Sequence, residues 1–423
     1  MRVQGTIRVP GDKSISHRAL MLSAVATGTS RIRGILQSAD VQSTAAVLRG
    51  LGAALPPLSG DFKIRGVGFD GLRASSLPLD CGNSGTTARL MAGVAAAQSF
   101  RSTFVGDSSL SRRPMRRIAK PLTEMGARVD LPQNGGLPMT VQGGALHAIE
   151  YFSETSSAQV KSGVLLAACI GRVGVSVIEP LASRDHTERM LSARGVQVQT
   201  MVIDRGHEIR LEPIQSLPGC DVDVPADPSS AAFFAGLGAL ARTGSIALRE
   251  VCMNPTRSGA FAVLSRMGAR IEISDRAERG GEPTATVTVR PGPLAATTIG
   301  GAEIPALIDE LPLIACVAAR ASGETVITGA GELRVKESDR IAAIVSNLRA
   351  VGAQAEELPD GLRVIGGSAP LGGRVTTHGD HRIAMAFGIL GAITGSPIQV
   401  DDRECVSVSY PGFWNDLASA VTR

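Results

Sequence analysis

Residues 264–273, Leu-Ser-Arg-Met-Gly-Ala-Arg-Ile-Glu-Ile, contain the pattern that decides the fold of this chain. Leu-x-x-x-Gly, followed by Ala or Val, occurs five times, at Leu48–Gly52, Leu122–Gly126, Leu191–Gly195, Leu264–Gly268 and Leu348–Gly352. Each glycine is placed where a helix ends and the backbone needs a positive φ before a strand begins. Copies separated by about 70 residues indicate a supersecondary unit of strands and helices that is used several times.

The predicted helices share a second property. Five stretches are apolar on nearly every side: 89–97, 163–170, 231–240, 311–319 and 383–393. A surface helix has one apolar stripe, whereas a helix that is apolar all round is buried. We therefore predict an α/β fold with helices in the core and sheets outside them, the inverse of the usual barrel.

The length of the chain predicts two domains. A chain of 423 residues exceeds one ordinary hydrophobic core, and two domains of about 200 residues are expected. Segments rich in Pro, Gly and Asp near residues 11–13 and 225–228 each precede a helix, as a hinge would.

Composition excludes several classes of function. A net charge of +4 and an aromatic content of 3% give no support to nucleic-acid binding. The apolar runs reach about ten residues, half of what a bilayer span needs, and residues 1–11 lack the apolar core of a secretory signal. We expect a cytoplasmic protein.

The cysteines and histidines predict no metal site. Six scattered cysteines form no Cys-x-x-Cys pair, and the six histidines have no ligand-like spacing. We expect reduced, mostly buried thiols and no bound metal.

Lysine is rare in this chain. The five lysines are Lys13, Lys63, Lys120, Lys161 and Lys336. An ammonium can serve in proton transfer, which a guanidinium cannot replace, so lysines inside polar motifs are candidate site residues.

Residues 11–18, Gly-Asp-Lys-Ser-Ile-Ser-His-Arg, precede an apolar run. Serines before a helix can cap its first turn, and the free N–H groups there can hold an anion beside Lys13, Ser14 and Arg18. Plain capping and anion binding both fit. The fragment lacks the first part of a P-loop.

Two further motifs lie in the amino-terminal half. Residues 82–89, Gly-Asn-Ser-Gly-Thr-Thr-Ala-Arg, form either a tight turn or a place where Gly85 lets a ligand approach the backbone. Residues 109–117 place four arginines within six positions. That run is either a solvated face or an arm that brings a guanidinium to a carboxylate or phosphate.

The charged clusters of the carboxyl-terminal half each adjoin an apolar helix. They are Asp309-Glu310, residues 334–340 (Arg-Val-Lys-Glu-Ser-Asp-Arg) and Asp380-His381-Arg382. Charge clusters are usually exposed, but contact with buried helices predicts that part of each faces a desolvated cleft.

Together these motifs resemble the signatures of the EPSP synthase family, in the family's order. Ser157-Ala158-Gln159 and residues 183–186, Ser-Arg-Asp-His, extend the resemblance from about residue 5 to about residue 415. The resemblance implies a two-domain inside-out α/β barrel built from six repeated βαβαββ-type units. One domain would contain residues 1–12 and 227–423, and the other residues 13–226.

The resemblance also implies the substrates and their contacts. Shikimate-3-phosphate would be held by Lys13, Ser14, Arg18, Ser157, Ala158, Gln159, Arg184, Asp309 and Lys336. Phosphoenolpyruvate would be held by Lys13, Gly85, Arg113, Gln159, Arg340 and Arg382. No cofactor, nucleic acid, membrane or protein partner is implied, and we expect a monomer.

The implied reaction is an addition followed by an elimination. Asp309 would accept the proton of the 5-hydroxyl as it attacks C2 of phosphoenolpyruvate. Glu337, or Lys13 as the alternative, would protonate C3, and phosphate would then leave.

Three other interpretations compete with this one. UDP-N-acetylglucosamine enolpyruvyl transferases share the fold and chemistry, but that family carries Lys-Asn near the amino terminus and a cysteine in the mobile loop. Here Ser14 follows Lys13, and residues 106–117 contain no cysteine. A P-loop nucleotide-binding module would require the missing loop, and a non-catalytic repeat scaffold would leave Asp309 and Glu337 without a purpose.

Overall fold

The computed structural model describes residues 1–394 and 397–422, which divide into two compact units. The first unit contains residues 1–10 and 225–278 and continues from Pro283 onward. The second unit contains residues 11–224 and 279–282. The short segment 279–282, the turn of a long hairpin, belongs to the second unit because its contacts lie there.

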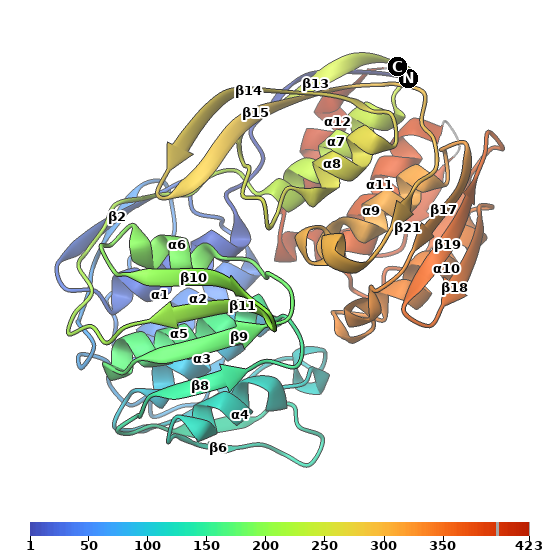
Figure 1. Ribbon diagram of the computed structural model, residues 1–423. Helices are drawn as coiled ribbons and strands as arrows, with labels where there is room; N and C mark the ends of the chain where they lie inside the picture. The colour runs from blue at the N-terminus through green and yellow to red at the C-terminus, as the bar shows by residue number, and fades with distance from the viewer. Residues whose placement is uncertain (395–396, 423) are drawn as a thin grey trace. The chain divides into compact units, whose positions relative to one another are not determined.

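The second unit contains six α-helices and eleven strands within the described chain. The helices are α1 (Lys13–Ala24), α2 (Ala39–Gly50), α3 (Gly85–Ala96), α4 (Arg116–Glu124), α5 (Ala158–Gly171) and α6 (His186–Ser192), with a 3-10 turn η1 (Leu110–Arg112). The strands are β2 (Thr29–Arg33), β3 (Phe62–Arg65), β4 (Leu79–Asp80), β5 (Arg101–Val105), β6 (Arg128–Asp130), β7 (Met139–Gln142), β8 (Ile149–Phe152), β9 (Val175–Glu179), β10 (Val198–Ile203), β11 (Gly206–Leu211) and β12 (Val222–Asp223). In Figure 1, β9, β10 and β11 run in front of α3 and α5.

The first unit has the same kinds of element. Its α-helices are α7 (Pro228–Leu240), α8 (Gly259–Arg266), α9 (Leu311–Ala318), α10 (Arg340–Ala350), α11 (His381–Thr394) and α12 (Phe413–Ala420). Its 3-10 turns are η2 (Gly301–Ala306), η3 (Ile308–Glu310), η4 (Gly331–Val335) and η5 (Glu404–Val408). Its strands are β1 (Arg2–Ile7), β13 (Thr243–Cys252), β14 (Arg270–Arg279), β15 (Glu282–Arg290), β16 (Thr298–Ile299), β17 (Gly323–Ile327), β18 (Gln354–Leu358), β19 (Gly361–Gly366), β20 (Gly373–Val375), β21 (Ile398–Val400) and β22 (Val421–Thr422).

The strands of the described chain form six sheets, three in each unit, and all but the parallel two-stranded sheet β20-β21 are mixed. Their orders are β14-β15-β13-β1-β22, β16-β17-β19-β18 and β20-β21 in the first unit, and β10-β11-β9-β8, β12-β2-β3 and β4-β5-β7-β6 in the second. Every sheet contains one parallel pair, such as β8 with β9 or β16 with β17. A parallel pair needs a crossover, and α5 and α9 supply it in these two cases. The predicted α/β class is therefore confirmed. Within the described residues, however, the sheets do not close into a barrel.

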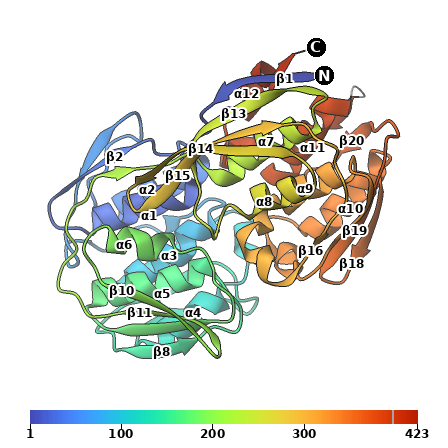
Figure 2. The same cartoon turned by 45° about the horizontal axis from the view of Figure 1, so that its top comes forward.

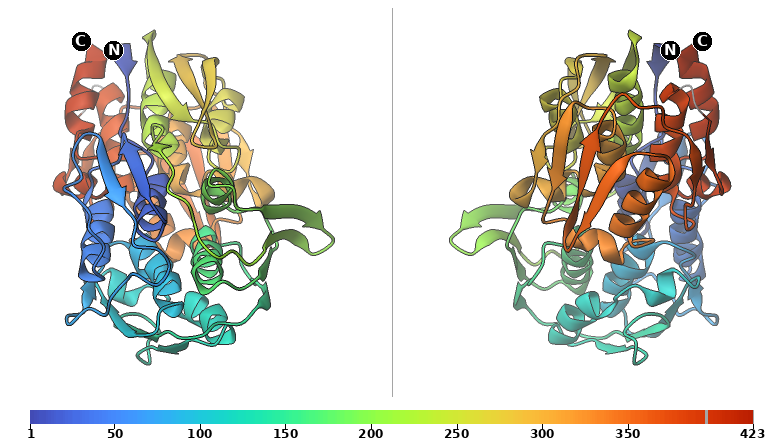
Figure 3. Two further views of the ribbon diagram at one scale, coloured as in Figure 1. Left: turned by 90° about the vertical axis from the view of Figure 1, so that its left-hand side faces the viewer. Right: turned by 90° about the vertical axis from the view of Figure 1, so that its right-hand side faces the viewer.

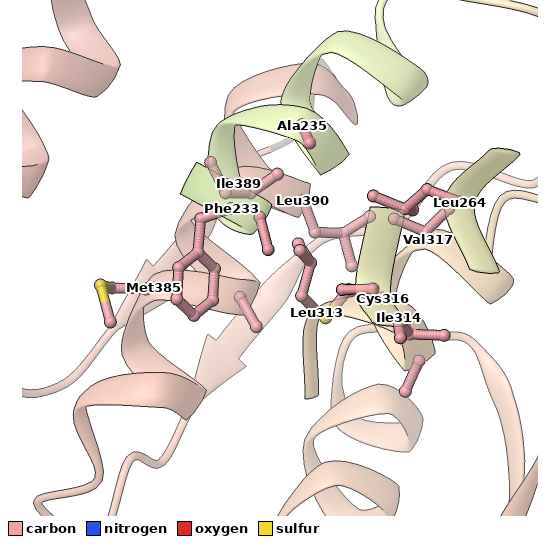
Figure 4. Packing of buried hydrophobic residues seen from close by; sticks show 14 of the residues in the cluster. Phe233, Ala235, Leu264, Leu313, Ile314, Cys316, Val317, Met385, Ile389 and Leu390 are labelled. Atoms are coloured by element: carbon pink, nitrogen blue, oxygen red, sulfur yellow. The ribbon is translucent and has the colours of Figure 1, made fainter. Parts of the chain in front are cut away.

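Helices that the sequence shows to be apolar on nearly every side are buried. Every residue of α7 and α9 is buried. Figure 4 shows Phe233 of α7, Leu313 of α9 and Leu390 of α11 converging in one apolar cluster. In the second unit, α3 and α5 approach closely at Gly93 and Gly163, where a Cβ on Gly93 would overlap the carbonyl of Gly163. Figure 2 shows α7 beside β13 and α9.

The five Leu-x-x-x-Gly patterns all end a helix. Their glycines have φ between 80° and 109°. In each copy the N–H of the residue after the glycine donates to the carbonyl of the leucine, as Ala269 does to Leu264 at 3.0 Å. This is the Schellman arrangement, in which a left-handed residue lets late N–H groups reach the last carbonyls. The predicted helix ends are therefore confirmed.

The cysteines are free thiols, as predicted. Cys81, Cys169, Cys252 and Cys316 are buried, and Cys220 and Cys405 are half-buried. Burial raises the pKa of Cys169 to about 12, because a thiolate loses its hydration inside the core. Such thiols behave as small apolar side chains.

Candidate active site

The residues at the start of α1 combine a helix cap with an ion pair. Asp12, fully buried, caps the helix by accepting from the N–H of Ile15 at 2.8 Å. The cap is therefore this aspartate and not the serines, which lie within the first two turns. Lys13 Nζ lies 2.9 Å from Asp40 Oδ2 on α2. The ammonium of Lys13 is thus held at a fixed place on the helix terminus.

Arg18 lies deeper, at 3% exposure. Its guanidinium donates to Thr187 Oγ1 at 2.7 Å, to Ser162 Oγ at 2.6 Å and to the carbonyl of Ser14 at 2.9 Å. These bonds join α1 to α5 and α6. Arg18 therefore also holds the helices of the second unit together, in addition to the ligand contact expected of it.

The start of α3 has the features of a ligand-binding helix terminus. Ser84 caps the helix by accepting from the N–H of Thr87 at 3.1 Å. Gly85 is the first helical residue, and a Cβ built on it would lie 2.7 Å from Arg89 Nη1 and 3.4 Å from Arg113 Nη1. Two guanidinium groups therefore lie against the bare side of Gly85, where free N–H groups already favour an anion.

Gln159 belongs to the same group of side chains. It stands in the first turn of α5, whose cap is Ser157. Its Oε1 accepts from Arg89 Nη1 at 2.6 Å, and its Nε2 donates to Thr86 Oγ1 at 3.0 Å. The starts of α3 and α5 are thus tied together by side chains.

Arg113 differs from the arginines around it. It is 9% exposed and donates to Asn83 Oδ1 at 2.6 Å, whereas Arg112 and Arg116 are exposed. The arginine-rich run is therefore a solvated face at some positions, and at Arg113 it is a buried cation beside Gly85.

Two further predicted contact residues of this unit, Ala158 and Arg184, are half-buried.

In the first unit, Asp309 is surrounded by three cations. Its Oδ1 lies 3.2 Å from Arg340 Nη1 and 3.6 Å from Lys336 Nζ. Its Oδ2 lies 3.7 Å from Arg382 Nη2. Asp309 is 8% exposed, so these contacts lie mostly out of water. The structure thus brings the predicted residues of this unit into one cluster.

Arg340 is the centre of that cluster, with its side chain 1% exposed. Its guanidinium donates to Asp380 at 2.8 and 3.3 Å and to Glu337 at 2.6 Å. Burial alone would lower the pKa of Arg340, but the charges of Asp380, Glu337 and Asp309 outweigh it and raise the pKa. Arg340 is therefore a permanent cation.

Arg382 completes the cluster. Its Nη1 donates to the carbonyl of Asp309 at 3.0 Å and lies 3.4 Å from Glu310 Oε1. Asp380 accepts from the N–H of Arg382 at 2.9 Å and from Ser338 Oγ at 3.0 Å. Four carboxylates, from residues 309, 310, 337 and 380, thus face three cations, from residues 336, 340 and 382.

Sequence reasoning did not assign four residues of these groups: Arg89, Glu310, Asp380 and Asp40. The first three stand inside motifs that the sequence singled out, so their position in a charged motif was an available signal. Asp40 lies outside all of the motifs that the sequence singled out. Its pairing with Lys13 depends on the packing of α1 against α2.

Two general findings accompany the geometry. Within 1–394 and 397–422, no group of three or more His, Cys, Asp or Glu side chains could hold a metal ion. None of the described helices is long and apolar enough to cross a membrane.

Comparison with known proteins identifies the family of this chain. The family model of EPSP synthase (3-phosphoshikimate 1-carboxyvinyltransferase) matches residues 1–417. The chain belongs to the EPSP synthase family. It is 44% identical to the 3-phosphoshikimate 1-carboxyvinyltransferase of Sulfurihydrogenibium sp. (strain YO3AOP1), over 98% of this chain and 97% of the relative. It is 49% identical to that of Xanthomonas euvesicatoria pv. vesicatoria (strain 85-10), over 97% and 93%.

Solved structures agree. EPSP synthase from Acinetobacter baumannii matches with a TM-score of 0.86 and 41% identity, over 99% of this chain and 95% of that structure. The enolpyruvyl transferase NikO from Streptomyces tendae matches with a TM-score of 0.74 at 17% identity, which shows the fold alone. As a family member, the chain is an enolpyruvyl transferase that acts on shikimate-3-phosphate. The family match therefore favours this activity over the UDP-N-acetylglucosamine and P-loop alternatives.

Proposed function

We propose that this chain carries out 3-phosphoshikimate 1-carboxyvinyl transfer with the residues of the two charged groups described above. Shikimate-3-phosphate contacts Lys13, Ser14, Arg18, Ser157, Ala158, Gln159, Arg184, Asp309 and Lys336. Phosphoenolpyruvate contacts Lys13, Gly85, Arg113, Gln159, Arg340 and Arg382. The substrates bring two phosphates and two carboxylates, and guanidinium and ammonium groups are the side chains that bind such anions best.

The observation that carries the proposal is the set of contacts around Asp309. A general base must lie next to the proton that it accepts and must be ready to take it. Three cations within 3.7 Å of Asp309 make its carboxylate a poor base as long as they are directed at it. In this proposal the substrate anions give Lys336, Arg340 and Arg382 new partners, and Asp309 becomes available as the base.

The proposed reaction needs no reactant beyond the two substrates and the acid and base groups of the enzyme. The 5-hydroxyl oxygen bonds to C2 of phosphoenolpyruvate, its proton passes to Asp309, and C3 receives a proton. The C2–O bond to phosphate then breaks, and a proton leaves C3 to restore the double bond. No electron is gained or lost, so the reaction requires no redox cofactor.

Glu337 is the proposed donor of the C3 proton, with Lys13 as the alternative. Glu337 Oε2 accepts from Arg340 Nη2 at 2.6 Å, which orients the carboxyl group beside the proposed phosphoenolpyruvate contact. Lys13 is oriented by Asp40. Two carboxyl groups in different surroundings can take different roles, one as base and one as acid.

The repeat architecture supports a finer description of the fold. The element order βαβαββ occurs in β4–β7, in β8–β11 and in β16–β19. We take the whole chain as six such units, three in each of two domains, residues 1–12 with 227–423 and residues 13–226. Free thiols, four of the six buried, are in keeping with a cytoplasmic enzyme, and we assign it as a monomer.

The experiment that tests the function is a coupled phosphate-release assay with purified protein. Shikimate-3-phosphate and phosphoenolpyruvate should together release phosphate, without ATP and in the presence of a chelator. Omission of either substrate should abolish release. UDP-N-acetylglucosamine in place of shikimate-3-phosphate is the matched control. Release with that nucleotide sugar, or strict dependence on ATP and Mg²⁺, would overturn the proposal.

A further inference from the structure

The turn of the β14–β15 hairpin lies against α6 of the second unit. Gly280 and Gly281 form the turn, with φ of +60° and +83°, a left-handed backbone that favours glycine. A Cβ on Gly281 would lie 3.4 Å from the carbonyl of Arg189. Arg189 Nη1 donates to the carbonyl of Gly281 at 3.2 Å. The turn is therefore in direct contact with the helix.

The first residue after the turn, Glu282, is buried at 1% exposure. His186 Nδ1 donates to Glu282 Oε1 at 2.6 Å, and His186 is itself fully buried. Arg189 Nε lies 3.8 Å from Glu282 Oε2. Burial of a carboxylate costs free energy unless the group is paired and hydrogen-bonded. Glu282 therefore depends on His186 and Arg189 for its place in the interior.

His186 begins α6, directly after Arg184 and Asp185. The residues on both sides of Arg184 are held by buried partners. Ser183 donates to Glu179 through its N–H at 2.8 Å and through its hydroxyl at 2.7 Å. Thr187 is fixed by Arg18 at 2.7 Å. The half-buried side chain of Arg184 therefore projects from a short segment whose flanking residues are anchored on both sides.

We propose that Glu282 and His186 are positioning residues for Arg184, so that the hairpin turn sets the affinity for the phosphorylated substrate. This inference rests on the proposed contact between Arg184 and shikimate-3-phosphate. The physical reason is entropic. An arginine on a loose segment loses freedom on binding an anion, whereas one on a fixed segment has already lost most of it.

The test compares Glu282→Ala with Glu278→Ala in the full-length enzyme. Glu278 is an exposed residue of β14, so it controls for the loss of one carboxylate from the same hairpin. Glu282→Ala should raise the KM for shikimate-3-phosphate about tenfold, the lower end of what loss of a charge-assisted hydrogen bond costs. The KM for phosphoenolpyruvate and kcat should change less than about twofold. Glu278→Ala should behave as wild type.

The double variant separates positioning from general damage. If Glu282 acts through Arg184, Glu282→Ala should add little to the effect of Arg184→Ala, because the group that it positions is already gone. Equal increases in both KM values, or fully additive effects in the double variant, would show a merely structural role and overturn the inference.

The controls also separate this inference from the proposed function. If Arg184→Ala left the KM for shikimate-3-phosphate unchanged, the proposed substrate contact itself would be wrong. If Arg184→Ala raised that KM and Glu282→Ala did not, only the positioning role would be wrong. Thermal unfolding of each variant checks that the fold is intact, and His186→Gln provides the second variant if Glu282→Ala fails to fold.

Discussion

Replacing Arg340 by Gln should destabilise the first unit strongly, because Arg340 neutralises three carboxylates in its interior. The guanidinium makes four hydrogen bonds, at 2.6 to 3.3 Å, to Asp380, Glu337 and Asp309. A glutamine amide keeps part of the volume but carries no charge. The carboxylates would remain close to one another without the central cation.

The magnitude follows from burial. Removal of one partner from a buried ion pair typically costs about 3–5 kcal/mol, because the remaining charge has lost its hydration. The side chain of Arg340 is 1% exposed and that of Asp380 is 0% exposed, so water does not screen the interaction between their charges. With a urea m-value of about 2 kcal/mol per M, the midpoint of unfolding should fall by about 2 M.

The chain contains a single tryptophan, Trp414, on α12 of the first unit. Its ring lies against Arg403 at 4.0 Å and against Phe413 at 4.9 Å. Urea unfolding followed by tryptophan fluorescence therefore reports the first unit specifically, and circular dichroism follows the whole chain.

Arg363→Gln is the matched control. Arg363 pairs with Glu324 and Glu356, at 3.4 and 3.1 Å, but its side chain is 39% exposed. Exposed pairs contribute about 0–1 kcal/mol, so its midpoint should shift only slightly. If Arg340→Gln shifted the midpoint no further than Arg363→Gln, the reasoning that Arg340 compensates buried charge would be refuted.

Three further changes test the site. Asp309→Asn should lower kcat by about 10²–10⁴-fold in the phosphate-release assay, because an amide cannot accept the hydroxyl proton. An unchanged kcat would show that Asp309 is not the general base. Gly85→Ala should raise the KM for phosphoenolpyruvate about tenfold, with little change in melting temperature, since its Cβ would meet only the ends of side chains, with Arg89 Nη1 2.7 Å and Arg113 Nη1 3.4 Å away. Unaltered KM would contradict the placement of that ligand. Burial, reinforced by two neighbouring cations, holds the pKa of His17 well below 6.5. As the pH falls below 6.5 the unfolded chain takes up the proton first, so the unfolding free energy falls by up to about 1.4 kcal/mol per pH unit until the folded pKa is reached. His17→Gln should flatten this dependence, measured by urea unfolding between about pH 7.5 and pH 5, while His147→Gln, at an exposed position, should leave it intact.

The protruding β10–β11 hairpin, visible in Figure 3, illustrates what sequence patterns leave out. The Leu191–Gly195 pattern correctly predicts that a helix ends before it. Val202, 79% exposed at its end, has the composition of a buried strand residue. Nothing in the local pattern distinguishes an apolar residue in the core from one on a projecting hairpin, because that depends on what packs against it.

Several features of this protein were determined by the sequence alone. The five Leu-x-x-x-Gly helix ends, the burial of helices such as α7 and α9, and the motifs around Lys13, Gly85, Asp309 and Arg340 could all be predicted. These features depend on residues within a turn or two of one another, where propensity and periodicity act directly.

Only the tertiary structure decided which charges meet. Lys13 pairs with Asp40, Arg340 with Asp380, and His186 with Glu282, across separations of 27, 40 and 96 residues. Each choice depends on which helices and turns pack together, and a buried charge stabilises only the arrangement in which its partner is within reach. The sequence shows that such charges are present, and the packing determines which of them form pairs.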